Sequence, residues 1–341
     1  LQEAKEAGQV FGEEVQIANR LAFDVEFFAK ELLGRVEKEV GQYYPAGENG
    51  KETIAYYWAR VGKCSNPACG ARVPLLRQFY LSRKSGKYIH LAPIIKGNEI
   101  DFEIKEGKTD LSGWINRGNL KCPCCENVTE AKALKRQSLV DDSDNHRMLA
   151  VIIDGDNGKE YRKPTEKEIE ILRNLPLNFL DRPQEAMPVK YTQALPSCTW
   201  GLEKWGQMFT PRQLLTLQTF VDQLQELKTE LAGWPEEYRN AVVTYLGIWV
   251  DRIAAVQTSF GRWDVTRENI QTPFGRQAIP MIFDYPEGNP FSESSGSVLN
   301  QINWILRYID GESEFFNSSV CNNASSGEKN QFPEKYLSAV I

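Results

Sequence analysis

Histidine and closely spaced glycines are scarce in this sequence. Only two histidines occur among 341 residues, so the chain has few ligands for a multi-histidine metal centre and few candidate bases for a histidine-based triad. No two glycines are separated by a single residue. This excludes, within the chain, the Gly-rich cofactor loop of Rossmann-type and methyltransferase enzymes.

Segments that would direct the chain to a membrane are also missing. No apolar run reaches the roughly 20 residues that span a bilayer. The first residues, Leu1-Gln-Glu-Ala-Lys, resemble neither a secretory signal nor a transit peptide. We therefore expect a cytoplasmic protein without a membrane partner. The initial Leu in place of Met leads us to expect a segment of a longer chain.

Cysteine is concentrated in two short loops, Cys64-Ser-Asn-Pro-Ala-Cys69-Gly70 and Cys122-Pro-Cys-Cys125. Zn²⁺ binds four thiolates in a tetrahedron, and two loops with paired thiols supply them. Gly70 allows a tight turn directly after the second thiol. The sequence therefore predicts one zinc ion held by Cys64, Cys69, Cys122 and Cys125.

Three alternatives to this ligand set stay open at the level of sequence. Cys124 could replace one of its neighbours as a ligand. The thiols could instead form two disulfides, or be buried as small apolar side chains. Nothing marks the chain for secretion, and clustered cysteines in odd number fit a reducing compartment, which favours zinc.

Charge is distributed unevenly along the chain. The net charge of −6 argues against a uniformly basic nucleic-acid-binding protein. Residues 53–98, however, contain eight Lys or Arg and no Asp or Glu. Such a stretch is a candidate phosphate-binding face, or else a solvated surface balanced by the acidic segment 99–110. The predicted nucleic-acid contacts are Arg72, Arg77, Arg83, Lys84 and Lys87.

Hydrophobic periodicity indicates an α+β fold. Apolar residues recur at helical spacing in 17–42, 211–224, 235–259 and 298–309, and alternate in strands near 53–63, 72–82, 87–95 and 98–105. The continuous apolar run in 146–154 indicates a buried strand. A loop is expected over 272–291; it contains Arg276, Asp284, Glu287 and Asn289, to which we assign no role. The expected organisation is an N-terminal amphipathic helix (1–50), a zinc-ribbon β domain (51–173), a Pro-rich linker (174–200), a helical domain (201–316), and a loop with the start of a strand (317–341).

Several long strings in the chain resemble one known family, the bacterial adenine-specific DNA methylases that carry a zinc ribbon. The resemblance spans most of the chain. The strings are Val40-Gly-Gln-Tyr-Tyr-Pro45, Cys64-Ser-Asn-Pro-Ala-Cys69-Gly-Ala-Arg-Val-Pro-Leu, Cys122-Pro-Cys-Cys125, Gly201-Leu-Glu-Lys-Trp-Gly206, Phe209-Thr-Pro-Arg-Gln-Leu-Leu215, Phe274-Gly-Arg-Gln-Ala-Ile-Pro280 and Asn289-Pro-Phe291.

The resemblance implies a parent enzyme that transfers a methyl group from S-adenosylmethionine to adenine in DNA. This chain would be an insertion in its Rossmann-like α/β fold, and the strand expected at 336–341 would lead toward the catalytic motif. Other restriction-modification or defence-system proteins are possible partners.

The departures from the family are as informative as the matches. The family's Gly-rich motif and its catalytic Asp-Pro-Pro-Tyr are both absent, and Glu126 stands where the second cysteine loop usually has Gly. The chain alone is therefore expected to be catalytically inactive, with no catalytic or S-adenosylmethionine-binding residue of its own. The alternative is a stand-alone zinc-ribbon adaptor that binds nucleic acid or protein without catalysis.

Overall fold

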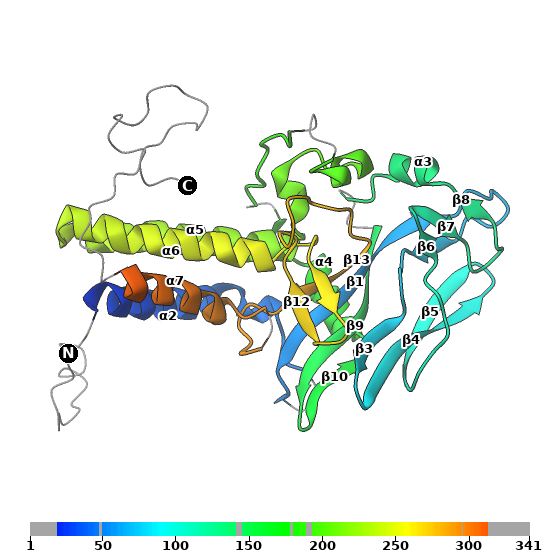
Figure 1. The fold of residues 1–341 in the computed structure, drawn as a ribbon, viewed down its shortest axis with the longest axis horizontal. Coiled ribbons are helices and arrows are strands. Elements are labelled where there is room, and N and C mark those ends of the chain that lie inside the picture. The colour runs from blue at the N-terminus through cyan, green and yellow to red at the C-terminus, as the bar shows by residue number, and fades with distance from the viewer. Residues whose placement is uncertain are drawn as a thin grey trace.

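A computed structural model describes residues 19–47, 50–140, 145–177, 180–188, 193–294 and 296–312. The expected segment 317–341 lies outside these residues. The described part has a bundle of long helices at one end and a group of antiparallel sheets at the other (Figure 1). The fold is thus a mixture of helices and antiparallel strands. No helix in the described ranges is long and apolar enough to cross a membrane.

Four helices form the bundle, and they come from both ends of the chain. They are α2 (Arg20–Val40), α5 (Pro211–Glu230), α6 (Glu236–Val256) and α7 (Val298–Glu312). Local signals start two of them: the Asn19 side chain accepts from the Ala22 N–H, and Thr210 caps α5 with Pro211 at its first position. One apolar core joins all four helices, including Leu32 and Trp249. The N-terminal helix therefore belongs to the same packed unit as the helices after residue 201.

The largest sheet has the strand order β10–β9–β1–β13, with β2 also paired to β1. Its strands are β1 (Thr53–Lys63), β2 (Arg72–Pro74), β9 (His146–Gly155), β10 (Gly158–Arg162) and β13 (Asp284–Gly288). All pairings are antiparallel. Both faces of β1 are buried along nearly its full length, because it lies between β9 and β13 and is covered on each side.

The expected loop over 272–291 is wrong for Asp284–Gly288, which form β13. Pro286 and the flanking prolines favoured a loop in the sequence. The strand accommodates Pro286 because β13 lies at the edge of the sheet, where only one side of its backbone must pair. A long-range partner, β1, imposes the extended conformation that the local sequence did not indicate.

Three smaller sheets surround the main one. They are β3 (Tyr80–Lys84), β4 (Lys87–Lys96) and β5 (Glu99–Glu106); β6 (Ile115–Asn116), β7 (Asn119–Lys121) and β8 (Val128–Thr129); and β11 (Arg262–Asp264) with β12 (Asn269–Gln271). The single hairpin arm expected over 72–82 is wrong. It divides into β2 and β3, because the intervening Leu75, Leu76 and Phe79 turn into the core.

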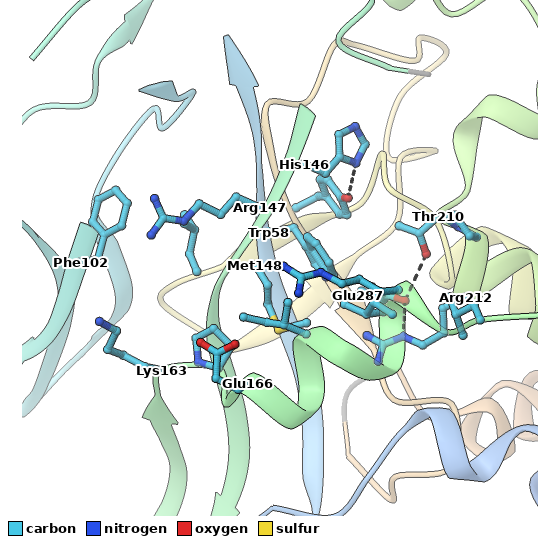
Figure 2. A pocket seen from close by; sticks show the side chains of 18 of the residues that line it. Trp58, Phe102, His146, Arg147, Met148, Lys163, Glu166, Thr210, Arg212 and Glu287 are labelled. Carbon is cyan, nitrogen blue, oxygen red and sulfur yellow. Dashed lines mark hydrogen bonds and ion pairs between the residues drawn. The ribbon is translucent and has the colours of Figure 1, made fainter. Parts of the chain in front are cut away.

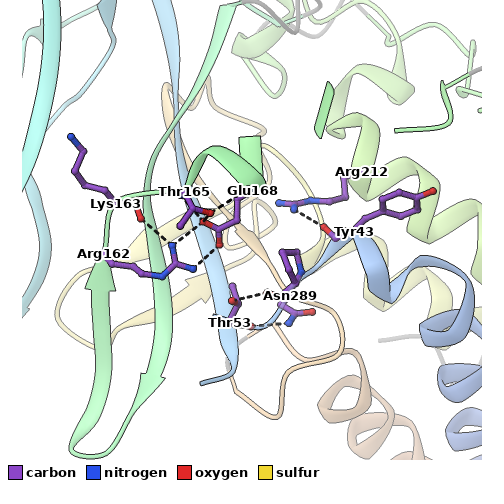
Figure 3. Close-up of polar contacts among 9 residues, drawn as sticks. Tyr43, Thr53, Arg162, Lys163, Thr165, Glu168, Arg212 and Asn289 are labelled. Carbon is purple, nitrogen blue, oxygen red and sulfur yellow. Dashed lines mark hydrogen bonds and ion pairs between the residues drawn. The ribbon is translucent and has the colours of Figure 1, made fainter. Parts of the chain in front are cut away.

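Two short helices accompany the sheets, α3 (Ala131–Leu134) and α4 (Glu166–Arg173). A capping box starts α4, in which Thr165 and Glu168 each bond to the other residue's backbone through their side chains. The same Glu168 carboxylate is buried and accepts a two-pronged ion pair from Arg162 of β10 (Figure 3). Its partners hold the pKa of Glu168 below its ordinary value against the opposing effect of burial. This pair fixes α4 against the main sheet.

A buried polar cluster joins the bundle to the sheet. Arg212, in the first turn of α5, donates from Nε to Glu287 Oε1 of β13 at 2.9 Å and from Nη1 to the carbonyl of Tyr43. Burial opposes the charge of Arg212, but Glu287 and the nearby tyrosines outweigh it, so the pKa of the guanidinium lies above its ordinary value. The segment expected as a linker also packs on the sheet core, through Leu195 and Trp200.

Candidate metal centre and nucleic-acid interface

Four cysteine sulfurs meet at one end of the sheets. The Sγ atoms of Cys64, Cys69, Cys122 and Cys125 all lie within 4.8 Å of one another. Cys64 and Cys125 are 3.7 Å apart, and Cys69 and Cys122 are 3.8 Å apart. Four thiolates bound tetrahedrally to Zn²⁺ at about 2.3 Å lie about 3.8 Å from each other. Disulfide sulfurs are separated by about 2 Å, so these thiols are not paired covalently.

The two cysteine loops have the same backbone plan. In each loop the N–H of the first cysteine donates to the carbonyl two residues after the last cysteine, Ala71 in one and Asn127 in the other. The residue directly after the last cysteine has a left-handed backbone in both: Gly70 has φ +58° and Glu126 has φ +60°. Glu126 thus adopts the same left-handed conformation as Gly70, at the strain expected for a residue with a Cβ atom.

Backbone N–H groups point at the sulfurs. Those of Cys124 and Cys125 donate to Cys122, and that of Asn66 donates to Cys64. Burial raises the pKa of the Cys122 and Cys64 thiols, whereas the Asn127 N–H lowers the pKa of Cys125 to about 7. Such donors stabilise thiolates, and a dication overcomes the remaining cost of deprotonation. The donor set and its spacing therefore fit a closed, structural zinc site.

Cys124 is not part of this group of four. It lies near the site and burial raises the pKa of its thiol, but it does not complete the cluster. The two loops are also joined without a metal, because the Ser65 N–H donates to Thr129 Oγ1 at 2.9 Å and the Asn127 side chain donates to Ser65 Oγ. The geometry favours Cys125 over Cys124 as the fourth ligand.

The predicted nucleic-acid contacts are not gathered on one face. Arg72 lies on β2, beside the first cysteine loop, and donates to Asn145 Oδ1. Arg83 and Lys84 are exposed at the turn between β3 and β4. The ten residues of β4 separate that turn from the β4–β5 turn beside Arg72, a span of roughly 30 Å. Arg77 is exposed next to Asp284, whose carboxylate accepts from the Arg77 backbone.

Lys87 has a structural partner that the sequence did not reveal. Its Nζ lies 2.7 Å from Glu268 Oε1, and Tyr161 donates to the same oxygen at 2.9 Å. Glu268 is buried and has φ +53° at the tip of the β11–β12 hairpin. Through Lys87 and Tyr161, Glu268 holds the β11–β12 hairpin against the β3–β4 and β9–β10 hairpins. The charge of Lys87 is therefore already compensated by Glu268.

Arg60, also within residues 53–98, is fully buried. Its guanidinium bonds to the carbonyl of Ile282 at 2.8 Å, to Ser259 Oγ at 3.1 Å and to His146 Nε2 at 2.9 Å. Burial lowers the pKa of Arg60 to about 10, and burial together with Arg60 lowers the pKa of His146 to about 3. Counting charges along the sequence therefore overstates the basic surface.

The polar residues of the 272–291 segment are used in the fold. Asn289 donates from Nδ2 to the carbonyl of Thr53 at 2.8 Å (Figure 3). Asp284 accepts from the Tyr57 hydroxyl at 2.5 Å, and burial raises the pKa of its carboxyl group. With Glu287 paired to Arg212, each of these three side chains has a partner within the fold.

A cavity of about 630 Å³ is the feature that sequence reasoning missed. It is lined by residues of β1, β5, β9, α4, β13 and the start of α5, including Trp58, Arg147, Arg212 and Glu287, and by Lys163 of the loop between β10 and α4 (Figure 2). These residues are distant in sequence, and no local motif connects them.

Comparison with known proteins finds no family model, no curated protein and no solved structure that matches this chain.

Proposed function

We propose that this chain is the central, zinc-binding and DNA-contacting segment of an S-adenosylmethionine-dependent adenine-specific DNA methyltransferase. In this proposal the sheets around the cysteine cluster form a zinc-ribbon region, the helical bundle is a second region, and both are inserted in the Rossmann-like fold of the parent enzyme. The methyl donor binds outside these residues. The long strings that resemble the zinc-ribbon methylases support the assignment.

The cysteine cluster is the observation that carries the proposal. Four thiols from two loops more than 50 residues apart converge at the spacing of a tetrahedral zinc site, and the backbone donors around them favour thiolates. All four ligand positions are filled by protein, which leaves no open position for a substrate. The metal therefore serves to hold the two loops and β1, β7 and β8 in place.

Metal analysis tests this site directly. Protein purified without chelator is expected to contain one zinc per chain, and Cys125→Ser is expected to lose it together with part of the folding stability. Cys124→Ser is the matched control and is expected to retain one zinc. Absence of zinc in the wild-type protein would contradict the site. Loss of zinc in the Cys124 variant, with retention in the Cys125 variant, would show that Cys124 is the fourth ligand in place of Cys125.

The coding sequence around this segment tests the assignment to a parent enzyme. A Gly-rich motif encoded before Leu1 and an Asp-Pro-Pro-Tyr encoded after Ile341 are the expected findings. If both are missing from the open reading frame, the chain is better described as a zinc-ribbon adaptor without catalysis.

A further inference from the structure

The cavity between β9, α4 and the first turn of α5 combines three chemically distinct parts. Its side wall is apolar and includes Trp58, Met148, Ile169 and Leu172. Figure 2 shows Arg147 and Lys163 on the side of Phe102, and Arg212 and Glu287 on the other side. Its volume of about 630 Å³ falls within the range of roughly 300–1,000 Å³ typical of small-ligand pockets.

The polar floor of the cavity is incompletely satisfied by the protein. Glu287 and Arg212 are 0% and 1% exposed, and Glu287 Oε1 accepts from both Arg212 and Thr210. Glu287 Oε2, Arg212 Nη2 and Trp58 Nε1 are buried and have no hydrogen-bond partner. Buried polar atoms almost always have a partner, whether protein, water or ligand. The three atoms belong to residues that line the cavity but are themselves closed off from solvent, so they give the cavity a polar floor.

The mouth of the cavity is cationic. Asp101 bridges Arg147 and Lys163, at 2.9 Å and 2.8 Å. Arg173, at the end of α4, lines the same cavity and is exposed. Three positive side chains thus face two carboxylates, those of Asp101 and Glu166.

A second cavity, of about 750 Å³, adjoins the first, since Asp101 and Arg147 line both. It adds Arg72 and Lys96 and reaches Gly70 of the first cysteine loop. We refer to the two adjoining cavities together as the groove, which extends from Gly70 of the first cysteine loop to the apolar pocket. Apart from the Arg212–Glu287 pair, its lining includes five cations and the three carboxylates of Glu99, Asp101 and Glu166.

We propose that this groove holds a strand of DNA and that the 630 Å³ cavity takes one unpaired nucleotide of it. The inference rests on the proposed function, that the chain contacts DNA. The base lies against the apolar wall beside Trp58, its polar edge faces the floor, and its phosphates lie at the cationic mouth. Stacking on aromatic side chains together with a basic groove is the usual way proteins bind unpaired nucleotides. Extracting a base from a duplex costs a few kcal/mol, so the groove prefers single strands.

Binding of oligonucleotides that differ by one base tests the proposal. Two fluorescein-labelled nonamers are compared by anisotropy with the full chain: one wholly abasic, the other abasic except for a central adenine. The wild-type protein is expected to bind the second on the order of ten-fold more tightly, because only that strand supplies a base to stack. Arg147→Glu with Lys163→Glu is expected to weaken binding of both strands, since phosphates are common to both.

A cavity-filling variant separates the pocket from the rest of the groove. Ile169→Trp places an indole in the cavity and is expected to abolish the preference for the strand with the base, while the abasic strand still binds. Glu170→Trp is the matched control, because its exposed neighbouring position on α4 does not line the cavity; it is expected to keep the preference. Thermal unfolding and zinc content verify that both variants are folded.

Each other result has a distinct meaning. Equal binding of both strands by the wild-type protein, or an unchanged preference in Ile169→Trp, overturns the nucleotide pocket and leaves the proposed function intact. Failure of every DNA to bind refutes DNA contact itself. Free deoxyadenosine monophosphate is expected to bind far more weakly than the single-base strand, because it lacks the backbone contacts. Equal affinity would show that the ligand is a free nucleotide, and the proposal would fall.

Discussion

Buried charges in this protein act mainly as connectors. Arg60 ties together three segments of the sheet region, and Glu168 holds α4 to β10. Arg212 and Glu287 link the bundle to the sheet at 1% and 0% exposure. A buried pair is costly to break because removal of one partner leaves an uncompensated charge, whereas an exposed pair is largely solvated.

Glu287→Ala is therefore expected to lower the free energy of unfolding by about 3–5 kcal/mol. The matched control is Glu230→Ala, which removes the partner of Arg35 in an ion pair whose carboxylate is half exposed; a loss of about 1 kcal/mol or less is expected. Urea denaturation followed by circular dichroism measures both values. Similar losses in the two variants would contradict a special role for the buried pair.

The turn of the β3–β4 hairpin presents two positive charges to solvent. Arg83 and Lys84 are exposed at its turn, and neither forms an ion pair within the described residues. Lys87, one position beyond the turn, is held by Glu268. The ion pair with Glu268 holds β4 in place next to the turn, so the positions of Arg83 and Lys84 are constrained.

Reversing the charge of both tip residues, with Arg83→Glu and Lys84→Glu, is expected to weaken duplex DNA binding. The slope of log affinity against log salt concentration should also fall in magnitude by about two, because the loss of two phosphate contacts reduces the number of counterions released on binding. Lys38→Glu with Lys228→Glu, at exposed positions of the bundle, is the control for net charge. If both double variants change the slope equally, the hairpin makes no specific phosphate contact.

The described chain consists of two apolar cores, one in the bundle and one in the sheets. Both use residues from early and late in the sequence, so neither α2 nor α7 folds onto a sequence neighbour alone. Within the described residues, the acidic side chains of the 272–291 segment are engaged in internal contacts. Methyl transfer needs the donor positioned beside the amine and acceptors for the developing charge, and in the proposed function both sets of groups belong to the parent enzyme outside these residues.

We therefore expect the isolated chain not to methylate DNA. The assay incubates it with labelled S-adenosylmethionine and adenine-containing DNA, and label transfer should not exceed that of a Cys64→Ser variant. Transfer above that control would show that a complete methyl-transfer site lies within these residues.

The sequence by itself determined the features that depend on neighbouring residues. The caps of α2, α4 and α5, the alternation of β5, the continuous apolar run of β9 and the pairing of thiols within each loop were all predictable, because each depends on residues a few positions apart. Only the tertiary structure decided that Asp284–Gly288 form a strand, that Lys87 and Arg60 are used internally, and that a cavity opens behind Trp58. These features depend on partners such as Arg212 and Glu287, which are 75 residues apart, and hydrophobic periodicity carries no information about contacts at that separation.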